Sequence, residues 1–131
     1  MIVDASVVVA GLLDDGPEGR WAEDVLASVG LAAPHLLPAE VANVLRRMER
    51  RGDISSDLAT LAMGDIESLG IDLVEFAPFH RRIWALHHNL TSYDGWYVAL
   101  AEAVGEPLAT LDRRLADATG IGCEVLFPSP S

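Results

Sequence analysis

Apolar and polar positions recur along the chain at two spacings, which predict short strands and amphipathic helices. Strands are predicted at residues 2–6, 31–34, 71–76, 106–112 and 123–127, where apolar and β-branched residues form short runs. Helices are predicted at residues 7–13, 20–30, 36–52, 55–70, 78–90, 91–105 and 113–120. Gly30, Gly52 and Gly70 each end one of these helices, which is the usual place for glycine.

Strands that alternate with helices predict the α/β class, with a central parallel sheet of about four to five strands and helices on both faces. The chain has 131 residues, a common length for one domain, so we expect a single domain over residues 1–131. Ligands of such sheets bind beyond the carboxyl ends of the strands. We therefore expect any chemistry at that edge.

Composition narrows the classes of function. The formal net charge is −11, from 20 acidic and 9 basic residues, and every basic residue is arginine. The absence of lysine excludes a P-loop and Schiff-base chemistry, and the acidity argues against broad electrostatic binding of nucleic acid. With Cys123 as the single cysteine, no signal-peptide pattern and no apolar run long enough for a transmembrane helix, we expect a reduced, cytoplasmic protein.

Four carboxylates stand where apolar neighbours predict burial. Asp4 and Asp112 end predicted strands, whereas Glu40 and Asp94 lie in the first turns of predicted helices. Each has a local explanation, because Asp is a good helix N-cap and acids near a helix N-terminus interact favourably with the dipole. However, the dipole contributes about 0.3–1 kcal/mol, whereas burying an unpaired charge costs several kcal/mol.

A parallel sheet brings strand ends and helix starts to one edge, so we expect these four carboxylates to meet there. Bare carboxylates would repel one another, and hard divalent cations such as Mg²⁺ and Mn²⁺ relieve that repulsion through oxygen ligands. Such a site suits metal-assisted hydrolysis of a phosphoester. Ser6 and Thr110 could support it, and Asn43, one helical turn after Glu40, could hold the glutamate in place.

The opening IVDAS, the segment AEVANVL, the run YDGWYVALAEAVGEPLATLD and the following RRL together resemble the PIN domain, specifically the VapC-type toxins of bacterial toxin–antitoxin pairs. The resemblance extends over essentially the whole chain. It implies an endoribonuclease that depends on Mg²⁺ or Mn²⁺, forms homodimers and is blocked by a cognate antitoxin.

By the same resemblance, Asp4, Glu40, Asp94 and Asp112 are the catalytic and metal-binding acids. Asp4 and Asp94 would be the most direct ligands, and Glu40 and Asp112 would complete the shell or position a second ion. The family also has polar residues at the positions of Ser6, Asn43 and Thr110, which line the site.

Eight of the nine arginines occur in pairs. Arg113 and Arg114 follow Asp112 directly, so they are the first candidates for contacts with RNA phosphates. The segment RRMERR, residues 46–51, places a basic stripe at the end of a helix. That stripe is explained either by the helix dipole, or by contact with RNA or an acidic partner segment.

Two other functions stay open at this point. An inactive PIN-like binding module would keep the fold and its partner surface without turnover. A metal-dependent phosphatase with Asp4 as nucleophile is less favoured, because such enzymes need a second aspartate two residues later and a lysine, whereas this chain has Ser6 and no lysine.

Overall fold

Strands and helices alternate along the chain in the computed structural model, which describes residues 1–129. The strands are Ile2–Val3 (β1), Ala32–Pro34 (β2), Asp72–Val74 (β3), Leu108–Ala109 (β4) and Val125–Leu126 (β5). The helices are Ala5–Leu13 (α1), Pro17–Leu26 (α2), Leu37–Arg50 (α3), Ser56–Ser68 (α4), His80–Ala85 (α5), Ser92–Val104 (α6) and Arg113–Ala116 (α7), with a 3₁₀ turn at Ala77–Phe79 (η1).

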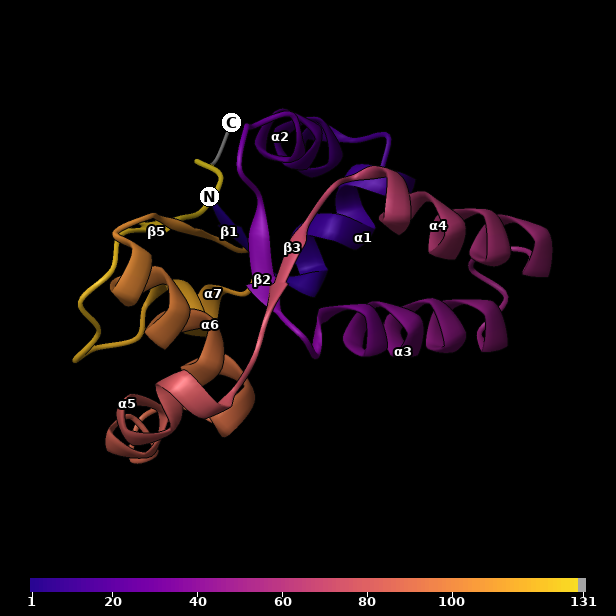
Figure 1. Ribbon diagram of the computed structural model, residues 1–131. Helices are drawn as coiled ribbons and strands as arrows, with labels where there is room; N and C mark the ends of the chain where they lie inside the picture. Colours follow the sequence, from indigo (N-terminus) through magenta and orange to yellow (C-terminus); the bar gives the residue numbers. More distant parts are fainter. Residues whose placement is uncertain (130–131) are drawn as a thin grey trace.

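The five strands form one sheet in the order β3-β2-β1-β4-β5, and every neighbouring pair is parallel. Helices α5, α6 and α7 lie on one side of this sheet, and α1, α3 and α4 lie on the other (Figure 1). Helix α2 packs on α1. The α/β class, the parallel sheet and the helices on both faces are therefore confirmed.

The apolar face of α6 fills the space over the centre of the sheet. Its residues Tyr97, Val98, Leu100 and Ala101 are almost completely buried, and α6 contacts β1, β2 and β4. This packing fixes the start of α6 near the carboxyl edge of the sheet. None of the helices between residues 1 and 129 combines the length and apolar character that a membrane crossing requires.

The pairing of β1 with β4 decides which side chains meet at that edge. Ile2 is opposite Leu108 and Val3 is opposite Ala109. Both strands end there, and the backbone N–H of Asp4 still donates to the carbonyl of Ala109 at 3.4 Å. The same register therefore brings the next residues, Asp4 and Thr110, face to face beyond the strand ends.

Several predicted elements are shorter than their sequence pattern indicated. The strand predicted at 2–6 ends at Val3, because Asp4 caps α1, and the helix predicted at 113–120 ends at Ala116. The strands predicted at 71–76 and 123–127 are also shorter at both ends.

The strand predicted at 106–112 ends at Ala109, because the hydroxyl of Thr110 accepts a hydrogen bond from the backbone of Asp112 and turns the chain. The helix predicted at 78–90 becomes η1 and the six-residue α5. Here the side chain of His87 bonds to the carbonyl of Trp84, an acceptor that a longer helix would use.

An ion pair near the surface joins α5 and α6 to the loop before β5. The guanidinium of Arg82 donates to both oxygens of Glu102, with Nε–Oε1 at 2.7 Å and Nη2–Oε2 at 2.9 Å. The backbone N–H of Gly122 donates to the same carboxylate at 2.5 Å. The hydrogen bond and charge of Arg82 lower the pKa of Glu102, so its charged form favours the folded state.

We expect Glu102→Gln to destabilise the protein by about 0.5–1 kcal/mol at neutral pH, because the amide loses the charge and one acceptor oxygen, while solvent screens the exposed guanidinium of Arg82. Since the folded pKa of Glu102 lies below its unfolded value, this stabilisation is present above the unfolded pKa and is lost as pH falls through the folded one. Chemical denaturation at neutral and acidic pH measures the effect. The exposed Glu67→Gln on α4 is the control, and equal losses in both variants would contradict the prediction.

Candidate active site

Asp4 lies at the centre of the carboxyl edge and is only 8% exposed. Its Oδ1 accepts hydrogen bonds from the hydroxyl of Ser6 at 2.5 Å and from the backbone N–H of Val7 at 3.2 Å. The hydroxyl of Thr110 donates to its Oδ2. Burial nevertheless raises the pKa of Asp4, and these hydrogen bonds offset only part of the rise. Asp4 is thus a helix N-cap and also a buried acid whose hydrogen bonds do not fully compensate for its loss of solvent.

Ser6 and Thr110 hold the two strand ends together through their second hydrogen bonds. The Ser6 oxygen accepts from the backbone N–H of Leu111 at 3.0 Å, and the Thr110 oxygen accepts from that of Asp112 at 2.9 Å. Each hydroxyl therefore bridges Asp4 to the loop that follows β4. This arrangement sets the position of Asp112 relative to Asp4.

Glu40 is half-buried in the first turn of α3, beside Asp4 and Asp94. The hydroxyl of Tyr97, from α6, donates to its Oε1 at 2.7 Å. Burial raises the pKa of Glu40 most, the Tyr97 hydrogen bond lowers it, and the charges of Asp4 and Asp94 raise it further. Among the described residues, Tyr97 and not Asn43 holds this side chain. Tyr97 lies one helical turn after Asp94, and this spacing was the sequence signal that could have placed its hydroxyl at the site.

Asp94 lies in the first turn of α6, whose N-cap Thr91 accepts a hydrogen bond from the Asp94 backbone at 3.2 Å. Burial raises the pKa of Asp94, and the charge of Asp112 raises it further, while Thr91 and the positive charge of Arg114 act in the opposite direction. Its side chain is therefore close enough to Asp112 for mutual repulsion.

The two arginines after Asp112 have different surroundings. Asp112 caps α7, and its carboxylate accepts from the backbone N–H of Arg114 at 2.9 Å and from Nη2 of Arg114 at 3.2 Å. The side chain of Arg114 is 82% exposed, which leaves donors for a ligand beside the acids. Arg113 instead lies over the ring of Phe127, 4.6 Å from its centroid. Arg114 is thus the arginine of this pair that faces the acidic edge.

Carboxylates offer oxygen ligands, and a set made only of oxygen ligands suits a hard divalent cation better than a soft one. Between residues 1 and 129, no three Asp, Glu, His or Cys side chains converge closely enough to bind one ion together as they stand. The carboxylates of Asp4 and Glu40 are turned towards hydroxyl donors. The arrangement therefore fits an ion held by one or two carboxylates that keeps several waters, as Mg²⁺ commonly does.

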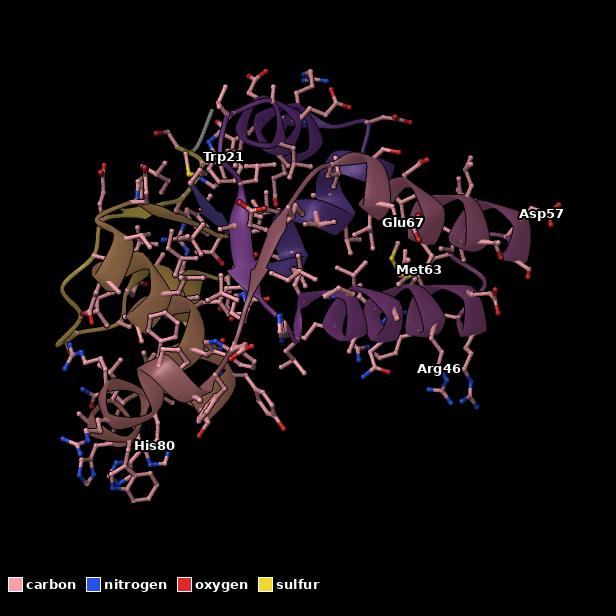
Figure 2. The ribbon with its side chains drawn as sticks, in the orientation of Figure 1. Trp21, Arg46, Asp57, Met63, Glu67 and His80 are labelled. Atoms are coloured by element: carbon pink, nitrogen blue, oxygen red, sulfur yellow. The ribbon has the colours of Figure 1, made fainter. Side chains whose placement is uncertain are left out.

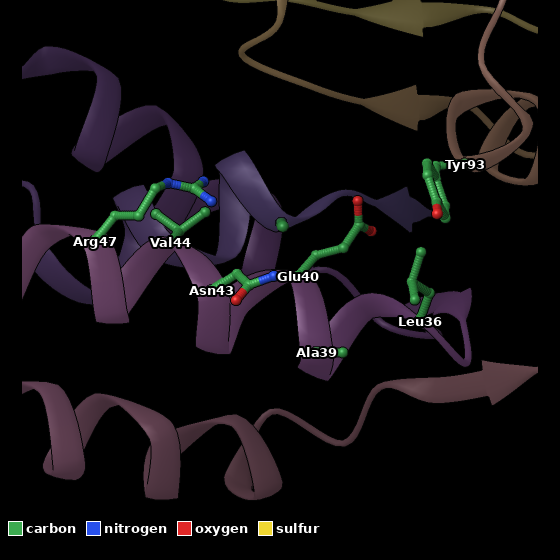
Figure 3. A pocket seen from close by; sticks show the side chains of 8 residues that line it. Leu36, Ala39, Glu40, Asn43, Val44, Arg47 and Tyr93 are labelled. Atoms are coloured by element: carbon green, nitrogen blue, oxygen red, sulfur yellow. The ribbon is translucent and has the colours of Figure 1, made fainter.

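An open pocket of about 370 Å³ adjoins this edge. Its lining includes Leu36, Glu40, Asn43, Val44, Arg47 and Tyr93. Figure 3 shows the carboxylate of Glu40 between Arg47, on the next turns of α3, and Tyr93 at the start of α6. Glu40 is consequently accessible from a hollow that holds both a positive charge and an aromatic ring.

We expect Asp4→Asn to raise the melting temperature of the protein by a few degrees at neutral pH in EDTA. The folded pKa of Asp4 lies above its unfolded value, so the free energy of unfolding falls as pH rises through the interval between them. The amide avoids that loss and should also bind less Mg²⁺, so added Mg²⁺ should raise the melting temperature of the wild type alone.

Thermal denaturation at acidic and neutral pH, with and without Mg²⁺, measures these effects. Asp15→Asn removes an exposed carboxylate from the loop after α1 and should change neither quantity. An Asp4→Asn protein that fails to fold would instead make Asp4 a structural cap.

Comparison with known proteins agrees with this geometry. The PIN domain family profile matches residues 1–121. The chain is 39% identical over 125 residues to Ribonuclease VapC1 of Mycobacterium tuberculosis, covering 95% of this chain and 94% of that protein. The crystal structure of PAE2754 from Pyrobaculum aerophilum superposes with a TM-score of 0.71 at 26% identity, covering 95% of this chain and 88% of that one.

The crystal structure of Mycobacterium tuberculosis VapC20, described as a sarcin-ricin loop cleaving toxin, has a TM-score of 0.67 at 15% identity. It covers 92% of this chain and 95% of that one, and at this identity it shows the shared fold alone. The family profile and the VapC1 match also show family membership, because they span nearly the whole chain and the VapC1 match is 39% identical. The chain therefore belongs to the PIN-domain family and, within it, to the VapC ribonucleases.

Proposed function

We propose that this chain is the toxin of a toxin–antitoxin pair and hydrolyses RNA phosphodiester bonds with Mg²⁺ or Mn²⁺ at Asp4, Glu40, Asp94 and Asp112. The observation that carries the proposal is the burial of Asp4, Glu40 and Asp94 at one sheet edge, which raises the pKa of all three. Such an arrangement is unfavourable for the protein alone and favourable once a cation and a phosphate bind.

Asp4 and Asp94 are the residues proposed to hold the cation, and Glu40 and Asp112 would complete the site. A divalent ion held there would supply an activated water, an anchor for the phosphate and positive charge for the leaving oxygen. The hydroxyls of Ser6 and Thr110 keep the Asp4 carboxylate in one orientation. That rigidity favours catalysis, because no reorganisation is needed when the substrate arrives.

Glu40 is suited to accept a proton from the attacking water. Its Oε1 is occupied by the Tyr97 hydroxyl, which leaves Oε2 towards the pocket to take the proton. A pKa above that of an ordinary glutamate makes this oxygen a better base near neutral pH. The exposed guanidinium of Arg114 is placed to contact a phosphate oxygen beside Asp112.

The proposal includes a cognate antitoxin that blocks the acidic edge, a homodimeric toxin and a cytoplasmic location, because the VapC family to which the chain belongs implies them. An inert binding module explains the site less well, since it would gain nothing from burying carboxylates that repel one another. A phosphatase is disfavoured as well, because Ser6 binds Asp4 where a second aspartate would be required.

Incubation of antitoxin-free protein with total RNA tests the function. We expect cleavage with Mg²⁺ or Mn²⁺ and none with EDTA. Asp94→Ala should reduce cleavage by at least about a hundredfold, since even residues outside the ligand shell contribute about 10- to 100-fold in metal enzymes. The matched control is Asp57→Ala in the first turn of α4, which Figure 2 shows at the outer end of that helix.

Circular dichroism of both variants verifies that the fold is intact. Cleavage that persists in EDTA, or equally in Asp94→Ala, would contradict the metal-dependent mechanism. Absence of both cleavage and Mg²⁺ binding in the wild type would favour the inert module.

A further inference from the structure

Arg47 lines the pocket beside the acidic edge without an ion-pair partner among residues 1–129. The ion pairs of residues 1–129 involve Arg51, Arg82, Arg114 and the N-terminal ammonium, and none involves Arg47. The side chain of Arg47 is exposed and lines the same pocket as Glu40. In a chain with a net charge of −11, this is a local positive charge that faces a negatively charged site.

We propose that Arg47 and Tyr93 form a two-point RNA subsite on either side of Glu40, in which Arg47 binds a phosphate and Tyr93 stacks on an unpaired base of the same strand. The inference rests on the proposed ribonuclease function and adds the residues that hold the RNA beside the acids. It also gives Arg47 a role in RNA binding that the other arginines of the segment 46–51 do not share.

Helix geometry places the phosphate that Arg47 would bind. Glu40 and Arg47 lie seven residues apart on α3, which is close to two turns, so they share a face and are separated by about 10 Å along the axis. Long side chains on a helix lean towards its N-terminus, which directs Arg47 towards Glu40. Arg47 is therefore placed to bind an RNA phosphate on the α3 side of Glu40.

Tyr93 supplies the second contact from the other end of the pocket. It directly precedes Asp94, its side chain is 59% exposed, and Figure 3 places it across Glu40 from Arg47. Aromatic side chains stack on RNA bases only where those bases are unstacked, as in single strands and loops. An RNA strand that passes from Tyr93 over Glu40 to Arg47 would cross the acids between its two contacts.

Val44 and Leu36 give the pocket an apolar wall between these groups, and Asn43 adds an amide. An acidic protein segment could pair with Arg47 and hydrogen-bond to this amide, but it carries no base to stack on the ring of Tyr93. An RNA strand can use all three groups, since it combines phosphates, aromatic bases and hydrogen-bonding edges. RNA is thus the better match to the pocket.

The neighbouring residue Arg46 is a matched control. It lies on a different face of α3, in a separate hollow towards α4 with Glu49, Thr60 and Met63. Figure 2 shows its side chain extending away from the body of the protein. Arg46→Ala and Arg47→Ala remove the same charge from adjacent positions, so a difference between them reports on the pocket.

The test is steady-state cleavage of a short single-stranded RNA that the wild type cleaves, over a range of salt concentrations. Arg47→Ala should raise KM about 10- to 100-fold with kcat nearly unchanged, because a charge-assisted contact made throughout the reaction is lost. The slope of log(kcat/KM) against log salt should become smaller by about 0.7, the value for one phosphate of a single strand. Tyr93→Ala should raise KM about tenfold, Tyr93→Phe should restore it, and Arg46→Ala should resemble the wild type.

The same RNA annealed to its complement should be a poor substrate for the wild type. Equal effects of Arg46→Ala and Arg47→Ala, equal cleavage of single strand and duplex, or a loss confined to kcat would each overturn the subsite. Normal cleavage by Arg47→Ala with lost binding of an acidic peptide would assign the pocket to a protein partner instead. If the wild type cleaves RNA with Mg²⁺ but the Arg47 and Tyr93 variants cleave it equally well, the subsite alone is refuted. If the wild type cleaves no RNA, the proposed function is refuted as well.

Discussion

The hydrogen bonds from Ser6 and Thr110 to the carboxylate of Asp4 are the contacts on which the rest of the site depends. They allow a charged group to sit almost completely buried at the end of β1. Through their second hydrogen bonds the same hydroxyls fix the loop after β4, and therefore the place of Asp112. Without them, the central strand of the sheet would end in an unpaired buried charge, which costs several kcal/mol.

At the acidic edge, the fold holds several carboxylates close together in positions that disfavour their charged forms. Burial raises the pKa of Asp4, Glu40 and Asp94. Neighbouring acids raise the pKa of Glu40 and Asp94 further, and Arg114 is the cation that lowers the pKa of Asp94. Core packing of α6 and the sheet holds these groups in place despite their repulsion. An edge that loses stability in this way is where we propose that a cation binds, which is consistent with membership of the VapC ribonucleases.

Much of the fold followed from periodicity and helix-ending residues, because apolar spacing is a local property. The strand order β3-β2-β1-β4-β5 could not be derived in this way, since it depends on how strands distant in sequence pair. Local side-chain hydrogen bonds also ended two elements early, at Thr110 and at His87. Such bonds compete with the backbone only where the geometry brings donor and acceptor together, and no propensity encodes that.

For the site, the sequence by itself determined which four acids are out of place among apolar neighbours and that they fall at strand ends and helix starts. A resemblance to VapC toxins then supplied their roles. Only the tertiary structure decided what surrounds them: Tyr97 binds Glu40 across 57 positions of the chain, Arg113 turns to Phe127, and Arg47 enters the pocket. The physical reason is that burial and side-chain hydrogen bonds depend on three-dimensional neighbours, whereas the tendency of a residue to form a strand, a helix or a cap depends on the few residues beside it.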